Sequence, residues 1–137
     1  MPVAAMEHTT EGAKAFVAFV VAELNYSQAS LASSRLRTLF SEGCTGCRAA
    51  LAYLATVRAK HGHFEGGVIS ADSVKARPLA ADPLKLIRVD FVYRATRQVV
   101  HLGTGRVEIY DAGSAHNHWI LSPTTRGWLV TDWTVGS

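Results

Sequence analysis

The 137-residue chain has 48% hydrophobic and 18% charged residues, which is typical of a globular protein and excludes extensive disorder. A chain of this length is expected to form one domain with a substantial core. Its formal net charge of +3 comes from basic residues spread along the chain, so no dense basic patch predicts binding to nucleic acid.

The N-terminal half is predicted to be helical. Residues 1–9 are expected to be a disordered lead or linker stub, and residues 10–135 a single domain. Apolar residues then recur on one side of a helix, and serine, glycine and alanine mark the bounds of two more. The three predicted helices span Thr10–Tyr26, Ser33–Gly43 and Cys44–Gly62.

The C-terminal half is predicted to be a meander of antiparallel strands. After Gly66 and Gly67 the hydrophobic pattern changes to period two, and turns rich in glycine or proline recur. A further turn is predicted at Ala81-Asp82-Pro83. The predicted strands span Val68–Ala76, Leu84–Ala95, Gln98–Leu102, Arg106–Tyr110, Ala115–Ser122 and Trp128–Val135. The chain is therefore predicted to be an α+β protein, with about three helices on the concave face of a curved antiparallel sheet of four to six strands.

Cys44 and Cys47 form a Cys-x-x-Cys motif between two predicted helices. A disulfide here would stabilise the fold by about 2 kcal/mol on chain entropy, provided that the compartment is oxidising. A thioredoxin-like redox pair would need a preceding strand, and a zinc site would need two further ligands nearby. The disulfide is the favoured interpretation, and the redox pair stays an alternative.

Two His-x-His pairs, His61/His63 and His116/His118, are the other potential metal ligands. No third ligand is linked to either pair by spacing, so they are interpreted as polar strand ends, and neither a metal nor a cofactor is predicted. Asp90 shares a strand face with Arg88 and Arg94 and is expected to form ion pairs.

The order of helices and strands, with the ending Gly127-Trp-Leu-Val-Thr-Asp-Trp133, resembles the cone-shaped nuclear transport factor two-like superfamily. The segment Glu11–Phe16, the segment Leu24–Tyr26, the Cys-x-x-Cys motif and the Gly-Trp-x-Val-x-Asp ending are similar to an uncharacterised family of actinobacterial lipoprotein-type proteins. The resemblance implies an extracytoplasmic, membrane-anchored full-length form, and pairing of two copies through the outer faces of their sheets. The chain as given lacks a lipobox and a long apolar segment, and it is expected to be soluble.

Such cones hold a cavity at the mouth of the sheet, so inward-facing aromatic and ionisable residues are its candidate lining. The candidates are Tyr93, His101, Tyr110, His116, Asp132 and Trp128. The first hypothesis is a non-enzymatic domain that binds a small apolar ligand or a protein partner. The alternatives are a cavity enzyme of isomerase, dehydratase or cyclase type that uses Asp132 or His101 as a base, and a thiol-disulfide redox protein.

Overall fold

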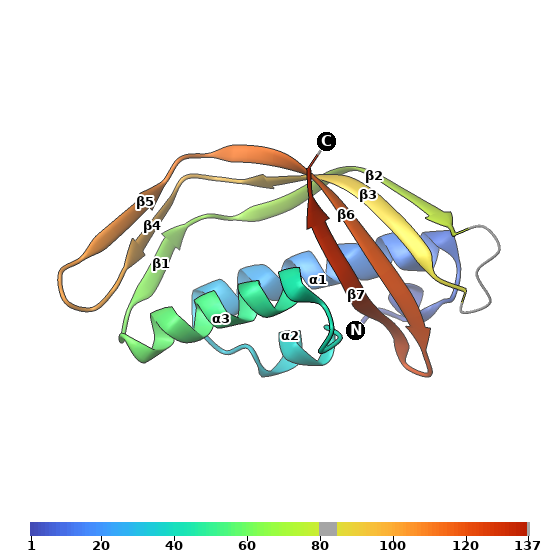
Figure 1. Ribbon diagram of the computed structural model, residues 1–137, viewed down its shortest axis with the longest axis horizontal. Coiled ribbons are helices and arrows are strands. Elements are labelled where there is room, and N and C mark those ends of the chain that lie inside the picture. Colours follow the sequence, from blue (N-terminus) through green and yellow to red (C-terminus); the bar gives the residue numbers. More distant parts are fainter. Residues whose placement is uncertain (80–84, 137) are drawn as a thin grey trace.

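The long helix α1 (Thr10–Ser30) runs along the concave side of a bent sheet (Figure 1). The structure is a computed structural model that describes residues 1–79 and 85–136. The helix begins as predicted, because the Thr9 hydroxyl accepts a hydrogen bond of 2.9 Å from the Gly12 amide. It continues past the predicted end at Tyr26 and stops where Leu31 adopts a left-handed conformation, with φ of 61°.

The remaining elements follow the predicted order of helices and then strands. A short 3₁₀ helix, η1 (Val3–Met6), precedes α1. The other helices are α2 (Ser34–Thr38) and α3 (Thr45–Ala59). The strands are β1 (His63–Gly66), β2 (Ile69–Pro78), β3 (Ile87–Ala95), β4 (Gln98–His101), β5 (Val107–Tyr110), β6 (Gly113–Thr124) and β7 (Gly127–Val135).

The described strands form two antiparallel sheets, with orders β1-β4-β5 and β2-β3-β6-β7. The α+β prediction is confirmed, although the described residues form seven strands where four to six were expected. Gly66 and Gly67 both have positive φ, so the chain bends there and continues from β1 into β2. The Gly67 amide donates to the Arg97 carbonyl at 2.9 Å, and the Thr96 amide donates to the Val68 carbonyl at 3.1 Å. Pairing therefore continues through the bend, and the two sheets form the arch seen in Figure 1.

Polar side chains of α1 hold the bend against the helix. The Asn25 amide group donates to the Ile69 carbonyl at 2.9 Å and accepts from the Ile69 amide at 2.8 Å. One turn later, Gln28 donates to the Gly67 carbonyl at 3.0 Å. These bonds satisfy backbone groups at the strand edge, and they fix the angle between the helix and the two sheets.

The core lies between α1 and the larger sheet. The apolar stripe of α1 and the inward residues of β3, β6 and β7 are buried together, as their periodicities predict. The largest members of this cluster are Phe16, Phe40, Phe91, Trp119 and Trp128.

The first nine residues were expected to be a disordered lead, whereas the structure packs part of this segment against the β6–β7 hairpin. Ala5 of η1 is fully buried, and the Trp128 indole donates to the Glu7 carbonyl at 3.1 Å. The Nε2 atom of His8 lies 2.8 Å from the Thr124 carbonyl oxygen and 2.9 Å from that of Gly127. These long-range contacts with the β6–β7 hairpin order a segment whose composition alone gives no structural signal.

None of the described helices is both long enough and apolar enough to cross a membrane. The predicted turn at Ala81-Asp82-Pro83, and the predicted start of a strand at Leu84, lie outside the described residues.

Candidate functional site

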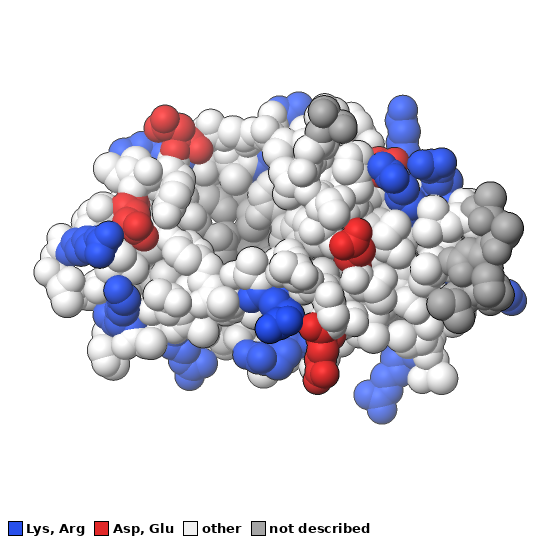
Figure 2. Space-filling view, viewed as in Figure 1, with Lys and Arg blue, Asp and Glu red and all other residues white. Residues whose placement is uncertain are grey.

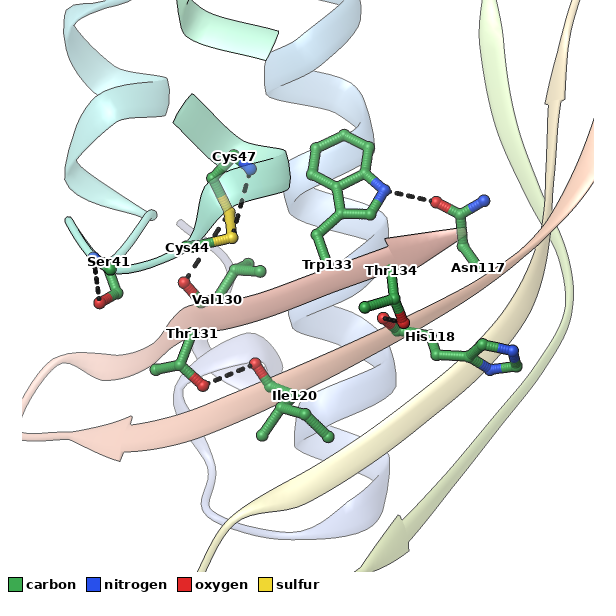
Figure 3. The surroundings of a disulfide bond; sticks show 11 residues. Ser41, Cys44, Cys47, Asn117, His118, Ile120, Val130, Thr131, Trp133 and Thr134 are labelled. Atoms are coloured by element: carbon green, nitrogen blue, oxygen red, sulfur yellow. Dashed lines mark hydrogen bonds between the residues drawn. A yellow bond between two sulfur atoms is a disulfide. The ribbon is translucent and has the colours of Figure 1, made fainter. Parts of the chain in front are cut away.

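Cys44 and Cys47 are disulfide-bonded, and both side chains are fully buried (Figure 3). Cys44 is the N-cap of α3, and its Sγ atom accepts a hydrogen bond of 3.2 Å from the Cys47 amide. The Cys47 Sγ atom lies 3.9 Å from the carbonyl oxygen of Val130 on β7. The disulfide therefore closes the first turn of α3 directly against the sheet.

The segment before the disulfide also pairs with β7. The Ser41 amide donates to the Val130 carbonyl at 2.9 Å, and the Val130 amide donates to the Leu39 carbonyl at 2.9 Å. A Cβ atom at Gly46 would lie 2.6 Å from the Trp133 carbonyl oxygen, so only glycine allows this approach. The sulfur atoms thus belong to a structural brace that joins α2 and α3 to β7.

A cavity of about 150 Å³ lies on the concave side, between α1, α3 and the strands at the bend. Figure 2 shows the surface hollowed between α3 and the bent strands. Every residue of the lining is apolar, aromatic or an uncharged amide. The lining residues are Leu24, Gln28, Ala50, Tyr53, Leu54, Phe64, Ile69, Tyr93 and Trp133.

Aromatic rings form one side of this cavity. The Trp133 ring centroid lies 6.2 Å from that of Tyr93 and 4.9 Å from that of Trp119 in the core. The Trp133 indole donates to the Oδ1 atom of buried Asn117 at 2.6 Å. The hydrogen bond and the ring contacts fix the orientation of Trp133, so this wall of the cavity is preorganised.

Tyr93, a residue of the same wall, carries a hydroxyl group. Burial raises the pKa of Tyr93 to about 12, so the hydroxyl stays protonated at neutral pH. It makes no hydrogen bond to another residue of the described ranges 1–79 and 85–136. Tyr53 differs, because its hydroxyl lies 3.4 Å from both the Tyr110 hydroxyl and a Glu108 carboxylate oxygen. Burial and its contact with Tyr110 raise the pKa of Tyr53. Tyr93 therefore offers a hydrogen-bond donor without a protein partner.

Of the six residues predicted to line a cavity, Tyr93 does so and the other five lie elsewhere. Trp128 is buried in the core and donates to the Glu7 carbonyl, and Tyr110 is 46% exposed on β5. His116 is exposed on β6, and His101 stacks on His63 at the end of the smaller sheet.

Asp132 was expected to face inward with Trp128 and Val130, but a β-bulge reverses its direction. Ile120 pairs with Asp132 whereas Leu121 pairs with Val130, so Thr131 is the extra residue. The Thr131 hydroxyl donates to the Ile120 carbonyl at 3.1 Å. Because the bulge shifts the alternation by one residue, Asp132 is exposed and Trp133 turns inward. Strict alternation could not predict Trp133 as a lining residue.

Asp90 forms the ion pair with Arg88 that the strand pattern predicts, whereas Arg94 pairs with Asp72. Asp90 Oδ1 lies 2.8 Å from Arg88 Nε and 2.6 Å from His118 Nδ1. Burial opposes ionisation of Asp90, but the hydrogen bonds from Arg88 and His118 outweigh it and hold the pKa below its usual value. His118 is thereby engaged with a carboxylate on the outer face, apart from exposed His116.

Replacing Asp90 by asparagine is expected to lower the free energy of unfolding by about 0.5–1 kcal/mol at neutral pH, because the group is partly exposed. A depressed folded-state pKa stabilises the protein above the unfolded-state pKa of about 4, and the contribution is lost as pH falls through the folded-state value. Urea unfolding of wild type and Asp90→Asn should therefore differ at about pH 7, and the difference should shrink progressively as the pH falls below about 4. Asp111→Asn, at an exposed residue, is the matched control and should change the free energy of unfolding by less than about 0.5 kcal/mol at neutral pH. A difference between wild type and Asp90→Asn that stays the same in acid would contradict the assignment.

A second, open groove of about 690 Å³ lies beside α2 and the start of α3. Its lining includes Arg37, Glu42 and Arg48 together with Phe40 and Leu51. Neither arginine forms an ion pair with another residue in the part of the chain that the structure describes. This charged lining is less suited to an apolar molecule than the uncharged lining of the cavity at the bend.

Solved structures with low sequence identity share the fold of this chain. The intermembrane space region of the chloroplast protein ARC6 is similar to this chain with a TM-score of 0.65 and 13% identity, over 93% of this chain and 95% of that one. A designed protein labelled Rd1NTF2_05 has a TM-score of 0.47 and 10% identity, over 90% of this chain and 99% of that one. No curated protein matches the chain.

The model of the Family of unknown function DUF6318 matches residues 1–132, a range that includes the packed N-terminal segment. The chain therefore belongs to the DUF6318 family.

Proposed function

We propose that this protein is a non-enzymatic binding domain that holds a small, largely apolar aromatic ligand in the cavity at the bend. The observation that carries the proposal is the lining, in which aliphatic and aromatic side chains surround one partially buried phenol without a protein partner. A concave apolar pocket with a few placed polar groups is the usual form of a small-molecule site.

The dimensions and chemistry of the cavity narrow the ligand class. An apolar cavity of about 150 Å³ can take a molecule of the size of benzene. The Tyr93 hydroxyl is protonated and would donate a hydrogen bond, so a ring that carries a carbonyl or another acceptor should be preferred over a plain hydrocarbon. The phenol also costs less free energy when it is paired than when it is desolvated alone.

The positions of the other candidate residues support binding over catalysis. The cavity-enzyme alternative used Asp132 or His101 as a base, and neither side chain lines the cavity. The two lining groups that titrate, Tyr53 and Tyr93, both have raised pKa values, which makes them poor bases near neutral pH. The redox alternative needs an accessible thiolate, whereas both cysteines are fully buried.

We also propose that the domain works outside the cytoplasm. The support is the buried Cys44–Cys47 disulfide, because such bonds persist in oxidising compartments and are rare in reducing ones. The likeness of the sequence to lipoprotein-type proteins points the same way.

The test of the binding proposal is a cavity-filling substitution. Ala50 lines the cavity from α3, and Ala50→Phe should occupy the ligand volume. Titration with acetophenone, followed by amide chemical shifts, is expected to give saturable binding to wild type with Kd of about 1 mM and no binding to Ala50→Phe.

Ala49→Phe is the matched control, because Ala49 is the exposed neighbour on the same helix. It should bind acetophenone as wild type does. Tyr93→Phe should remove the preference for acetophenone over ethylbenzene, which lacks the acceptor. Equal binding by Ala50→Phe and wild type, or no saturable binding by wild type, would overturn the proposal.

A further inference from the structure

Two histidines and a glutamate meet at the outer end of the smaller sheet. His63 on β1 pairs directly with His101 on β4, and their rings are stacked with centroids 4.2 Å apart and planes 10° apart. Glu65 lies two residues after His63, on the same face of β1. Its Oε1 atom is 3.2 Å from His101 Nε2 and 3.7 Å from His63 Nε2. One potential ligand atom from each residue lies within 4.8 Å of the other two.

One potential ligand atom of the cluster is buried and lacks a hydrogen bond. The Nε2 atom of His101 is buried and makes no hydrogen bond to any residue in the described parts of the chain, and its 3.2 Å contact with Glu65 is an ion pair only when the ring is protonated. A buried ring nitrogen without a hydrogen bond costs free energy, and a cation bound between this nitrogen and the carboxylate would remove that cost. His63 and Glu65 are mostly exposed, so the same place is open to an ion from solvent.

The backbone beneath the cluster is held in close contact. A Cβ atom at Gly62 would lie 1.9 Å from the His101 carbonyl oxygen, and a Cβ atom at Gly103 would lie 1.9 Å from that of Lys60. These glycines let the turn after α3 lie directly against the end of β4. The distance between the two histidines is therefore set by backbone packing rather than by flexible side chains.

We propose that His63, Glu65 and His101 form a binding site for Zn²⁺. Two imidazole nitrogens and one carboxylate oxygen are a ligand set that suits zinc, with the fourth tetrahedral position left to water. A bound ion would connect β1 to β4 and would satisfy His101 Nε2. The site is separate from the cavity, because Phe64, between the two β1 ligands, points to the opposite face and lines the cavity.

Calorimetric titration of the metal-free protein with Zn²⁺ at about pH 7 tests the site. One ion per chain is expected, with Kd of about 1–10 μM. His63→Ala, His101→Ala and Glu65→Gln should each weaken binding about tenfold or more, because each removes one ligand. Binding should also weaken towards about pH 5.5, since imidazole binds metal only in its neutral form.

His116→Ala is the matched control, because His116 is an exposed strand histidine outside the cluster. It should leave the affinity unchanged. In wild type, Zn²⁺ should shift the ring proton resonances of His63 and His101 before those of the other histidines, a readout that does not depend on how the variants fold. Wild-type affinity in His63→Ala and His101→Ala, or equal shifts in all histidines, would overturn the proposal.

Discussion

Replacing Trp119 by alanine is expected to lower the free energy of unfolding by about 3–5 kcal/mol, as for other fully buried aromatic side chains. Trp119 is the largest fully buried residue. Its ring lies 5.0 Å from Phe91 and 4.9 Å from Trp133, centroid to centroid. The substitution would leave a void beside the wall that orients Trp133. Urea unfolding followed by circular dichroism measures the loss.

A conservative variant and an exposed control are compared with Trp119→Ala. Trp119→Phe should cost clearly less than Trp119→Ala, because it keeps most of the buried area and removes an indole N–H that has no partner in the described chain. Val68→Ala, at a residue that is 59% exposed, should change stability by less than about 0.5 kcal/mol. If Trp119→Ala proves no more costly than Val68→Ala, this arrangement of the core is contradicted.

Removing the disulfide with the double substitution Cys44→Ala/Cys47→Ala is expected to lower the free energy of unfolding by about 2 kcal/mol. The loop it closes is short, so the entropic contribution is near the lower end of the range for disulfides. The loss arises because the bond holds the start of α3 beside β7 in the folded state and restricts the unfolded chain. Chemical unfolding under non-reducing conditions measures it.

Reductant provides the control for the disulfide. Wild type should lose about the same stability when it is reduced, whereas the double alanine variant should be indifferent to the reducing agent. A wild type whose unfolding curve does not move on reduction would show that Cys44 and Cys47 do not brace the fold.

The parts of the fold that follow from local pattern could be predicted from the sequence. The apolar stripe of α1, the Thr9 cap and the alternation along β3 depend on neighbouring residues in the chain, and they appear in the structure as expected. The Gly66-Gly67 pair was interpreted as a break, with the first strand beginning only after it. Positive φ at both residues instead bends the chain between β1 and β2. The strand β1 was therefore missed, and one sheet was predicted where the described residues form two.

The candidate site depends on features that single-sequence patterns do not contain. A bulge at Thr131 exchanged Asp132 for Trp133 as the inward residue. The meeting of His63 with His101 depends on the register between two strands that are distant in the chain. The order of the first nine residues likewise depends on long-range contacts with the β6–β7 hairpin, such as the hydrogen bond from Trp128 to Glu7.

A crystal of the protein pressurised with xenon tests the proposed ligand cavity most directly, because xenon occupies apolar cavities of about this volume without any specific chemistry. A xenon atom is expected between Tyr93, Trp133 and Phe64, and it should be absent from the same crystal form of Ala50→Phe. If the space is filled by protein side chains, or if xenon binds only outside it, the cavity at the bend is not a ligand site.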